Sequence, residues 1–234
     1  MIDIHTHILY GVDDGAGDLM LALDMLGEEW KQGVSSVVLT PHYGPKFESL
    51  PVGELKKKYE RLCDRAREFY PDLKLYLGSE IYYYDGMLHD LQAGKIPTIN
   101  DTQYILVEFS FEERDSEIMH AIEELVYAGY IPIIAHVERY RSLLEQYDTI
   151  ESLMDAGAYI QVNVKSFLGG MFHRKTSFVK KLVKMNLVDF IGSDCHDLVD
   201  RVPNLEAGRK VIEKLTDFSR FMENAERVLK GDYI

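Results

Sequence analysis

The sequence is poor in cysteine and has no long apolar run. Cys63 and Cys195 are too few for a disulfide framework, so a reducing, cytoplasmic environment is expected. No stretch approaches the length of about eighteen consecutive apolar residues that a membrane span needs. The first residues also lack the basic-then-apolar pattern of a secretory leader. These absences argue against a disulfide-stabilised secreted domain and against an integral membrane protein.

Positive charge is also scarce. The chain has 26 Lys and Arg residues against 39 Asp and Glu residues, a formal net charge of −13. Proteins that bind nucleic acid or anionic membranes need clustered basic residues, which this composition does not favour. Some of the negative charge can belong to site carboxylates that bound cations neutralise. The balance therefore directs attention to the carboxylates themselves.

Predicted strands and helices alternate along the 234 residues, which indicates one α/β domain, residues 1–234, with a mainly parallel sheet. Seven such units in so short a chain favour a small or distorted barrel over a doubly wound sheet. A glycine-rich dinucleotide-binding turn, typical of the open sheet, is absent. The predicted strands are 2–6, 36–40, 73–79, 104–109, 131–135, 158–162 and 188–193. The predicted helices are 18–32, 53–69, 85–92, 115–128, 148–156, 174–185 and 204–215.

Two His or Asp pairs stand at the ends of the first and last predicted strands. Ile2 and Ile4 alternate with polar residues, which places His5 and His7 on one face, where both imidazoles can reach one ion. Asp194 and His196 repeat the spacing after the buried strand 188–193. A single His-x-His is common, but two such pairs in one domain indicate a metal site.

Further ligand-type residues follow the intervening strands. His42, Glu80, Glu108 and His136 each come at or just after the end of a predicted strand, and Asp13 or Asp14 could add a carboxylate from the loop after the first strand. In a barrel, strand ends at the carboxyl face gather at one rim. About nine such groups are too many for one ion and enough for two or three. Nitrogen and oxygen ligands without thiolate favour manganese, iron or zinc.

Five motifs in this order resemble the PHP (polymerase and histidinol phosphatase) superfamily, in particular the bacterial tyrosine phosphatases of capsule and exopolysaccharide clusters. They are Asp3-Ile4-His5-Thr6-His7, Thr40-Pro41-His42, Gly78-Ser79-Glu80, Ala135-His136-Val137-Glu138-Arg139 and Ser193-Asp194-Cys195-His196. The resemblance implies a distorted (β/α)7 barrel and a trinuclear centre, often of manganese. One ion would take His5, His7, Glu80 and Asp194, a second Glu80, Glu108 and His136, and a third Asp14, His42 and His196.

The same resemblance implies a metal-dependent protein-tyrosine phosphatase that uses a metal-bridged hydroxide. Arg139 and Arg201 match the family arginines that hold the substrate phosphate, and His42 could assist the leaving group. The implied partner is the tyrosine-rich tail of a membrane-bound kinase in polysaccharide export. Alternatives are a small-molecule phosphatase such as histidinol phosphatase, or a non-catalytic metal-binding regulator. A nucleic-acid exonuclease lacks a basic stripe in support.

Cys195 and Arg201 form a Cys-x5-Arg spacing, the signature of thiol-based tyrosine phosphatases. That chemistry needs a depressed thiol pKa and a loop of backbone N–H groups around phosphate. The segment instead carries Asp197 and Asp200 and has no glycine, and alternation points Cys195 away from Asp194 and His196. A cysteine nucleophile is therefore not expected. Tyr82, Tyr83 and Tyr84 follow Glu80 and either flank the site or pack at the barrel top.

Overall fold

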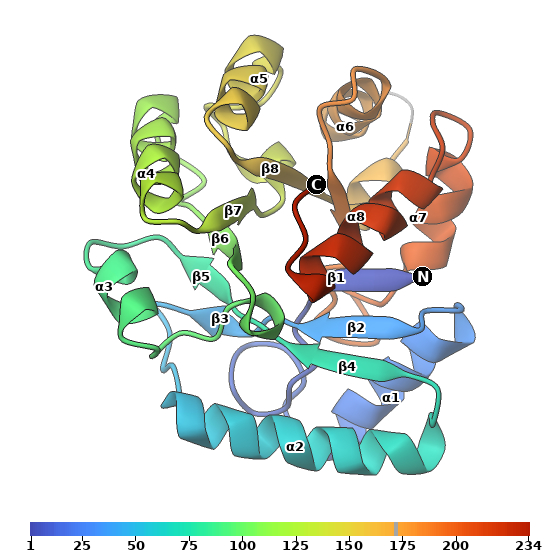
Figure 1. The fold of residues 1–234 in the computed structure, drawn as a ribbon. Helices are drawn as coiled ribbons and strands as arrows, with labels where there is room; N and C mark the ends of the chain where they lie inside the picture. Colours follow the sequence, from blue (N-terminus) through green and yellow to red (C-terminus); the bar gives the residue numbers. More distant parts are fainter. Residues whose placement is uncertain (171–172) are drawn as a thin grey trace.

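The computed structural model describes residues 1–170 and 173–234, in which a three-stranded and a six-stranded parallel sheet curl together into a ring (Figure 1). Every pairing between its strands is parallel. The ring closes between the first and last strands, where the Asp194 N–H donates to the His5 carbonyl and the His7 N–H to the Cys195 carbonyl, both at 2.9 Å. The strands are β1 (Ile2–Thr6), β2 (Ser36–Leu39), β3 (His42–Tyr43), β4 (Lys74–Leu77), β5 (Glu80–Tyr82), β6 (Tyr104–Glu108), β7 (Ile131–Ile134), β8 (Tyr159–Asn163) and β9 (Phe190–Gly192).

Two of the predicted strands, 36–40 and 73–79, are each followed after a short break by a second strand that lies beyond the predicted range. Pro41 stands between β2 and β3, and proline cannot donate a ladder hydrogen bond. Gly78 and Ser79 separate β4 from β5, and backbone bonds from Gly78 to Leu39 and from Glu80 to Pro41 hold the broken strands together. Counted as continuous, these pairs leave seven strands in the described chain. The predicted distorted (β/α)7 barrel is confirmed.

Helices surround the ring of strands (Figure 1). The Asp18 side chain caps α1, because it accepts hydrogen bonds from the N–H groups of Met20 and Leu21 at 2.9 Å. The predicted helices agree within a few residues, except that sequence patterning did not predict α8. The helices are α1 (Leu19–Lys31), α2 (Val52–Phe69), α3 (Met87–Gln92), α4 (Asp115–Tyr127), α5 (Tyr147–Asp155), α6 (Arg174–Lys184), α7 (Leu205–Ile212) and α8 (Ser219–Lys230). Short 3₁₀ turns are η1 (Ile99–Asp101), η2 (Val137–Arg139) and η3 (Val164–Phe167).

The barrel interior is apolar, and α8 contacts β1 and β9 from the end opposite the strand carboxyl termini. Ile4, Val38 and Leu106 point inward from their strands and belong to the same buried cluster as Ala225 and Val228 of α8. Burying one such large apolar side chain contributes about 1.5–3 kcal/mol. The interior is thus filled up to the level at which the strands end, and the polar groups collect at the carboxyl rim.

None of the helices in residues 1–170 and 173–234 combines the length and the hydropathy that crossing a bilayer requires.

Candidate metal centre

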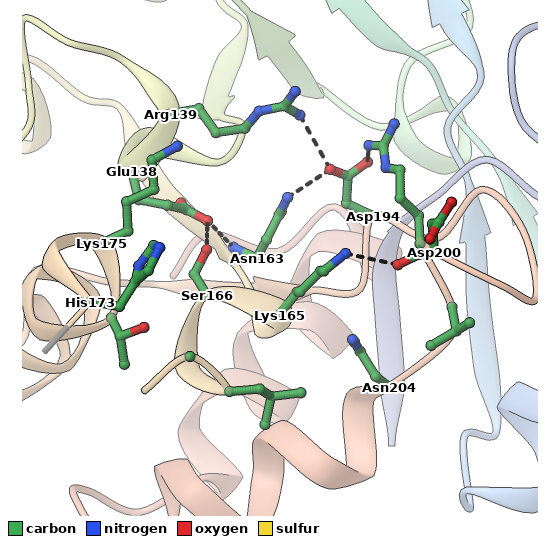
Figure 2. Close-up of a pocket in the computed structure, with 15 residues that line it drawn as sticks. Glu138, Arg139, Asn163, Lys165, Ser166, His173, Lys175, Asp194, Asp200 and Asn204 are labelled. Carbon is green, nitrogen blue, oxygen red and sulfur yellow. Dashed lines mark hydrogen bonds and ion pairs between the residues drawn. The ribbon is translucent and has the colours of Figure 1, made fainter. Parts of the chain in front are cut away.

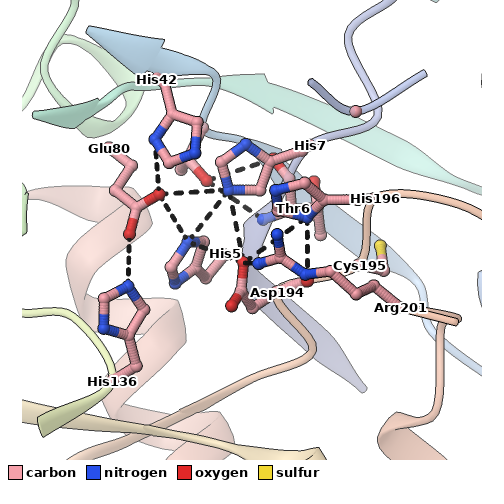
Figure 3. Close-up of polar contacts among 12 residues, drawn as sticks. His5, Thr6, His7, His42, Glu80, His136, Asp194, Cys195, His196 and Arg201 are labelled. Carbon is pink, nitrogen blue, oxygen red and sulfur yellow. Dashed lines mark hydrogen bonds and ion pairs between the residues drawn. The ribbon is translucent and has the colours of Figure 1, made fainter. Parts of the chain in front are cut away.

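The two histidines of the first strand meet side by side at the carboxyl rim. His5 and His7 are fully buried, and their Nε2 atoms lie 3.3 Å apart (Figure 3). Two ligand atoms on one ion, each at about 2.1 Å, lie roughly 3–4 Å from each other. The period-two spacing of β1 therefore produces the pairing that a shared ion requires.

Glu80 lies at the centre of the cluster. Its Oε2 is 3.3 Å from His5 Nε2, 3.2 Å from His7 Nε2 and 3.0 Å from His42 Nδ1, while its Oε1 is 2.8 Å from His136 Nε2. The register explains part of this, because His42 on β3 pairs directly with Glu80 on β5. A carboxylate with histidines on both oxygens is suited to bridge two cations.

Asp194 approaches the same histidines from the last strand. Its Oδ1 lies 3.6 Å from His5 Nε2, 3.4 Å from His7 Nε2 and 3.6 Å from His196 Nδ1. Asp194 and His136 have positive φ angles of 54° and 33°, which are uncommon for residues other than glycine. Each of these residues follows the end of a strand and carries a ligand-type side chain. Uncommon backbone conformations of this kind cluster at functional sites.

The structure brings all nine predicted metal-ligating residues to this one rim. Ligand atoms fall into three groups whose members lie within 4.8 Å of one another. One group joins His5, His7 and Glu80, and another joins His42, Glu80 and Glu108. The third group is His7, Asp14, His42 and His196. His136 and Asp194 adjoin these groups through the contacts to Glu80, His5 and His7.

Several buried polar atoms in the cluster lie near other polar atoms but form no hydrogen bond of acceptable geometry among the described residues. They are Glu80 Oε2, His42 Nδ1, His136 Nδ1 and His196 Nε2. Such orphans are rare in proteins, because an unpaired buried polar group costs about 1–3 kcal/mol. Lone pairs that converge without hydrogen-bond geometry are what divalent cations would satisfy, so the residues fit a metal centre.

Burial and charge act against each other on the carboxyl groups. Burial raises the pKa of Glu80, but His5, His136 and His42 outweigh it and hold that pKa well below its usual range. Asp194 behaves likewise, with His5 and His7 overcoming burial to lower its pKa. At Glu108, burial and the negative charge of Glu80 together raise the pKa to about 8. The protein alone therefore keeps only part of this carboxyl cluster charged, and cations would stabilise the rest.

A layer of side chains behind the ligands orients them, and the sequence reasoning missed two of its members. Gln161 Oε1 accepts the His136 N–H at 2.6 Å and lies 3.4 Å from His5 Nδ1. Asn163 Nδ2 donates to Asp194 Oδ2 at 2.6 Å (Figure 2). Both residues lie on β8, the strand for which no site residue was predicted. Their signal was the alternation of polar and apolar residues along this otherwise buried strand.

Asp13 also belongs to this supporting layer. Its Oδ2 lies 2.7 Å from His7 Nδ1 and accepts the His42 N–H at 3.1 Å. A carboxylate on the second nitrogen of a ligand histidine fixes the tautomer and the ring orientation. Of the two neighbouring aspartates, Asp14 faces the cavity, with Oδ1 3.3 Å from His196 Nε2 and 3.5 Å from His42 Nε2.

The two predicted phosphate-binding arginines flank Asp194. Arg139 Nη1 is 3.4 Å from Asp194 Oδ2, and Arg201 Nη2 is 2.6 Å from Asp194 Oδ1. The Arg139 guanidinium lies over the Phe111 ring, 4.3 Å from its centroid. Both arginines line one open pocket of about 370 Å³ together with Asp14, His42 and Glu108, and we call it the mouth pocket.

The aromatic residues divide between the mouth pocket and the surrounding surface. Phe47 stacks on His42 with ring centroids 4.3 Å apart, and Phe47, Tyr82 and Phe111 line the mouth pocket. Tyr83 instead donates to Glu124 and Tyr84 to Asp90, beside a separate pocket. Of the three consecutive tyrosines, only Tyr82 flanks the site.

Cys195 faces away from the metal cluster (Figure 3). It is fully buried, and its Sγ lies 3.8 Å from Glu29 Oε1. Burial and the nearby Glu29 and Asp3 carboxyl groups raise the pKa of the Cys195 thiol well above its usual range. A thiolate nucleophile therefore has neither the position nor the ionisation that it needs, in agreement with the sequence-based expectation.

A family model and individual relatives place the chain among the same group of proteins. A family model described as capsular polysaccharide synthesis, CpsB/CapC, matches residues 1–230. The tyrosine-protein phosphatase CpsB of Streptococcus agalactiae serotype III (strain NEM316) is 34% identical over 245 residues and covers 100% of both chains. The tyrosine-protein phosphatase YwqE of Bacillus subtilis (strain 168) is 32% identical over 239 residues, covering 100% of this chain and 93% of its own.

Solved structures extend the comparison to the fold. A chain from the structures of Bacillus subtilis YwqE and Streptococcus pneumoniae CpsB, described as unique metal-dependent tyrosine phosphatases, superposes with a TM-score of 0.91. It is 32% identical, with 100% of this chain and 96% of that chain covered. Histidinol phosphate phosphatase of Lactococcus lactis, at a TM-score of 0.56 and 14% identity, covers 100% of this chain and 95% of its own and shares the fold alone.

Proposed function

The chain belongs to the CpsB/CapC family of capsular polysaccharide synthesis, and we propose that it is a metal-dependent protein-tyrosine phosphatase. One structural observation supports this proposal independently of the similarity to named relatives. Nine imidazole and carboxyl groups cluster at the carboxyl rim, and three of them, Asp14, His42 and Glu108, line the mouth pocket together with two arginines and four aromatic residues. That arrangement can hold cations, a phosphoryl group and an aryl ring at adjacent places.

We assign the ligands to two or three divalent ions, most favourably manganese, with iron and zinc as alternatives. The first ion would take His5, His7, Glu80 and Asp194, the second Glu80, Glu108 and His136, and the third Asp14, His42 and His196. The contacts of Glu80 to histidines on both of its oxygens support a bridging role. Mixed nitrogen and oxygen donors without thiolate support the choice of metals. The whole chain, residues 1–234, would act as one catalytic domain.

Divalent cations in this centre supply the chemistry that acidifies water and neutralises negative charge on a transferring phosphoryl group. The chain's own residues then position the substrate. Arg139 and Arg201 would donate hydrogen bonds to phosphoryl oxygens in the paired geometry for which guanidinium groups are suited. His42, which borders the mouth pocket beside Phe47, would assist the departure of the phenolate.

The mouth pocket favours an aryl phosphate over an aliphatic one. Phe47, Tyr82 and Phe111 present aromatic rings around the entrance, and aromatic pairs contribute about 0.5–1.5 kcal/mol beyond their area burial. A phosphotyrosine ring can pack against them while its phosphate reaches the arginines. The substrate we propose is the phosphorylated tail of a membrane-bound tyrosine kinase in capsule or exopolysaccharide export, met in the cytoplasm. The family's description in capsular polysaccharide synthesis supports that setting.

The experiment is a comparison of three phosphomonoesters with protein reconstituted in manganese. We expect kcat/KM for a phosphotyrosine peptide to exceed that for a matched phosphoserine peptide and for histidinol phosphate. A clear preference for histidinol phosphate would replace this proposal with a small-molecule phosphatase. Hydrolysis of none of the three by metal-loaded protein would indicate a non-catalytic metal-binding regulator.

A further inference from the structure

A second and larger pocket adjoins the mouth pocket through the arginines that both share, and Figure 2 shows its lining. Its volume is about 660 Å³, and it shares Arg139, Asp194 and Arg201 with the centre. Lys165, Lys175 and Thr176 also line it, so we call it the basic pocket. Because Arg139 and Arg201 line both spaces, a chain bound at the mouth pocket can continue directly into the basic pocket.

The basic pocket is more positive than the chain around it. Arg139, Lys165, Lys175 and Arg201 line it, against the three carboxyl groups of Glu138, Asp194 and Asp200. The lining thus has one more cationic side chain than carboxyl groups, in a chain whose formal net charge is −13. Asp194 already contacts Arg201, and Figure 2 shows its contacts with Asn163 and Arg139. The Glu138 carboxyl accepts hydrogen bonds from Ser166 and from the Asn163 N–H.

The two lysines are not neutralised within the described chain. Lys175 makes no ion pair there, and Lys165 donates only to the backbone carbonyl of Asp200, at 2.7 Å. Lys175 also stands in the first turn of α6, which contains no acidic residue. Helix N-termini carry partial positive charge and unpaired N–H groups, so acidic residues are the usual occupants of such a turn. The Lys175 ammonium group and the partial positive charge of the α6 N-terminus therefore lie at the same place in the basic pocket.

Buried polar atoms in the basic pocket independently indicate a missing partner. Thr176 is 1% exposed, lines the pocket, and its hydroxyl has no hydrogen-bond partner within residues 1–170 and 173–234. Asn204 Oδ1 and Glu138 Oε2, from two other segments that line the pocket, are also unpartnered there. A bound acidic peptide would satisfy these costly buried atoms, because its carboxylates can accept from the Thr176 hydroxyl and its backbone N–H groups can donate to the two oxygens.

We propose that the basic pocket binds the acidic residues that flank phosphotyrosine in the substrate. This inference rests on the proposed function, and it adds a second recognition site to it. The charge of Lys165 and Lys175 selects carboxylates. The apolar side chains of Leu168 and Val202 on the same lining accommodate the stem of a glutamate or the peptide backbone. A volume of about 660 Å³ is large for a single small anion.

The test uses two phosphotyrosine peptides that differ only at the residues on both sides of the phosphotyrosine, glutamate in one and glutamine in the other. We expect the wild type to hydrolyse the glutamate peptide with a kcat/KM roughly fivefold higher. In a Lys165→Glu, Lys175→Glu double variant, that ratio should fall to about one or below. Turnover of para-nitrophenyl phosphate, which has no flanking residues, is measured for each protein as a control for the activity of the metal centre itself.

Lys184→Glu is the matched control, because Lys184 is an exposed lysine at the opposite end of the same helix α6. The Lys184→Glu variant should leave the ratio of kcat/KM between the glutamate and glutamine peptides unchanged. Thermal unfolding would confirm that this variant and the double variant are folded. Equal hydrolysis of the two peptides by the wild type, or an equal ratio in wild type and double variant, would overturn the inference. The proposed tyrosine-phosphatase function would survive those results. It would fail if the metal-loaded wild type hydrolysed neither of the two phosphotyrosine peptides nor para-nitrophenyl phosphate.

Discussion

Asn163 on β8 donates its side-chain amide to Oδ2 of Asp194 at 2.6 Å and leaves Oδ1 of Asp194 facing His5 and His7. The amide thus fixes which carboxylate oxygen is presented to a cation. Partners of this kind tune metal affinity without binding the metal.

Asn163→Ala should therefore weaken metal binding more than it weakens chemistry. We expect the manganese concentration for half-maximal activity to rise about 10–100-fold, with most activity restored at saturating metal. Metal titration followed by turnover of a phosphotyrosine peptide measures both quantities. Asn224→Ala removes a comparable amide bond, to the Asp189 carbonyl, and serves as the control. An unchanged titration curve would show that the bond to Asp194 does not tune the site.

His136→Ala should remove most activity from a protein that stays folded. The imidazole is buried, and its Nε2 lies 2.8 Å from Glu80 Oε1 and 3.5 Å from Glu108 Oε1, so its loss takes a donor from the centre. We expect kcat/KM to fall by on the order of 100-fold or more, since loss even of an outer-shell partner costs about 10–100-fold. Circular dichroism checks the fold. Unchanged turnover would exclude His136 from the site.

Cys195→Ser should retain activity. The thiol is buried on the side of Glu29, away from the metal cluster, and its pKa is raised by burial. We expect kcat within about threefold of the wild type, together with a modest loss of stability from the buried hydroxyl. Steady-state kinetics and resistance of the wild type to iodoacetamide provide the measurements. An inactive but folded variant would restore the cysteine mechanism.

Asp189 should make the protein less stable as the pH rises from about 4 to 7. Burial raises its pKa to about 6, above the usual value near 3.8, even though the carboxylate accepts the Ile160 N–H. The folded state then binds more protons than the unfolded state between these values. The stabilisation is full below about pH 4 and is lost as the pH passes 6, by at most about 3 kcal/mol.

Urea unfolding of the wild type and Asp189→Asn across this range measures the contribution of Asp189. The difference in the free energy of unfolding between the two proteins should change with pH in the stated direction. A constant difference would contradict the shifted pKa.

The fold was largely predictable because hydrophobic runs and helix periodicity are local properties. The alternation of Ile2 and Ile4 placed His5 and His7 correctly, and the cap at Asp18 marked the start of α1. Helix α8 was missed, although its buried residues Phe221, Ala225 and Val228 recur at helical spacing. Its role became evident only once the barrel end that it covers was known.

The clustering of the nine ligand-type residues could be anticipated from the sequence, but the layer of side chains behind them could not. Ligand-type side chains are chemically distinctive at strand ends, whereas Gln161 and Asn163 resemble ordinary polar residues in a strand. Their roles depend on the pairing of β8 with β7 and β9, which follows from closure of the barrel. The basic pocket was missed for the same reason, because it gathers residues from η2, β8, α6 and the segment after β9.

The most direct test of the central claim is to measure bound metal and phosphotyrosine-peptide turnover on the same samples during stepwise removal and return of manganese. We predict two or three bound ions per chain at full activity, loss of turnover as they are removed, and recovery on their return. Full turnover by protein stripped of all divalent ions would contradict this prediction, as would failure of the folded chain to bind any of them.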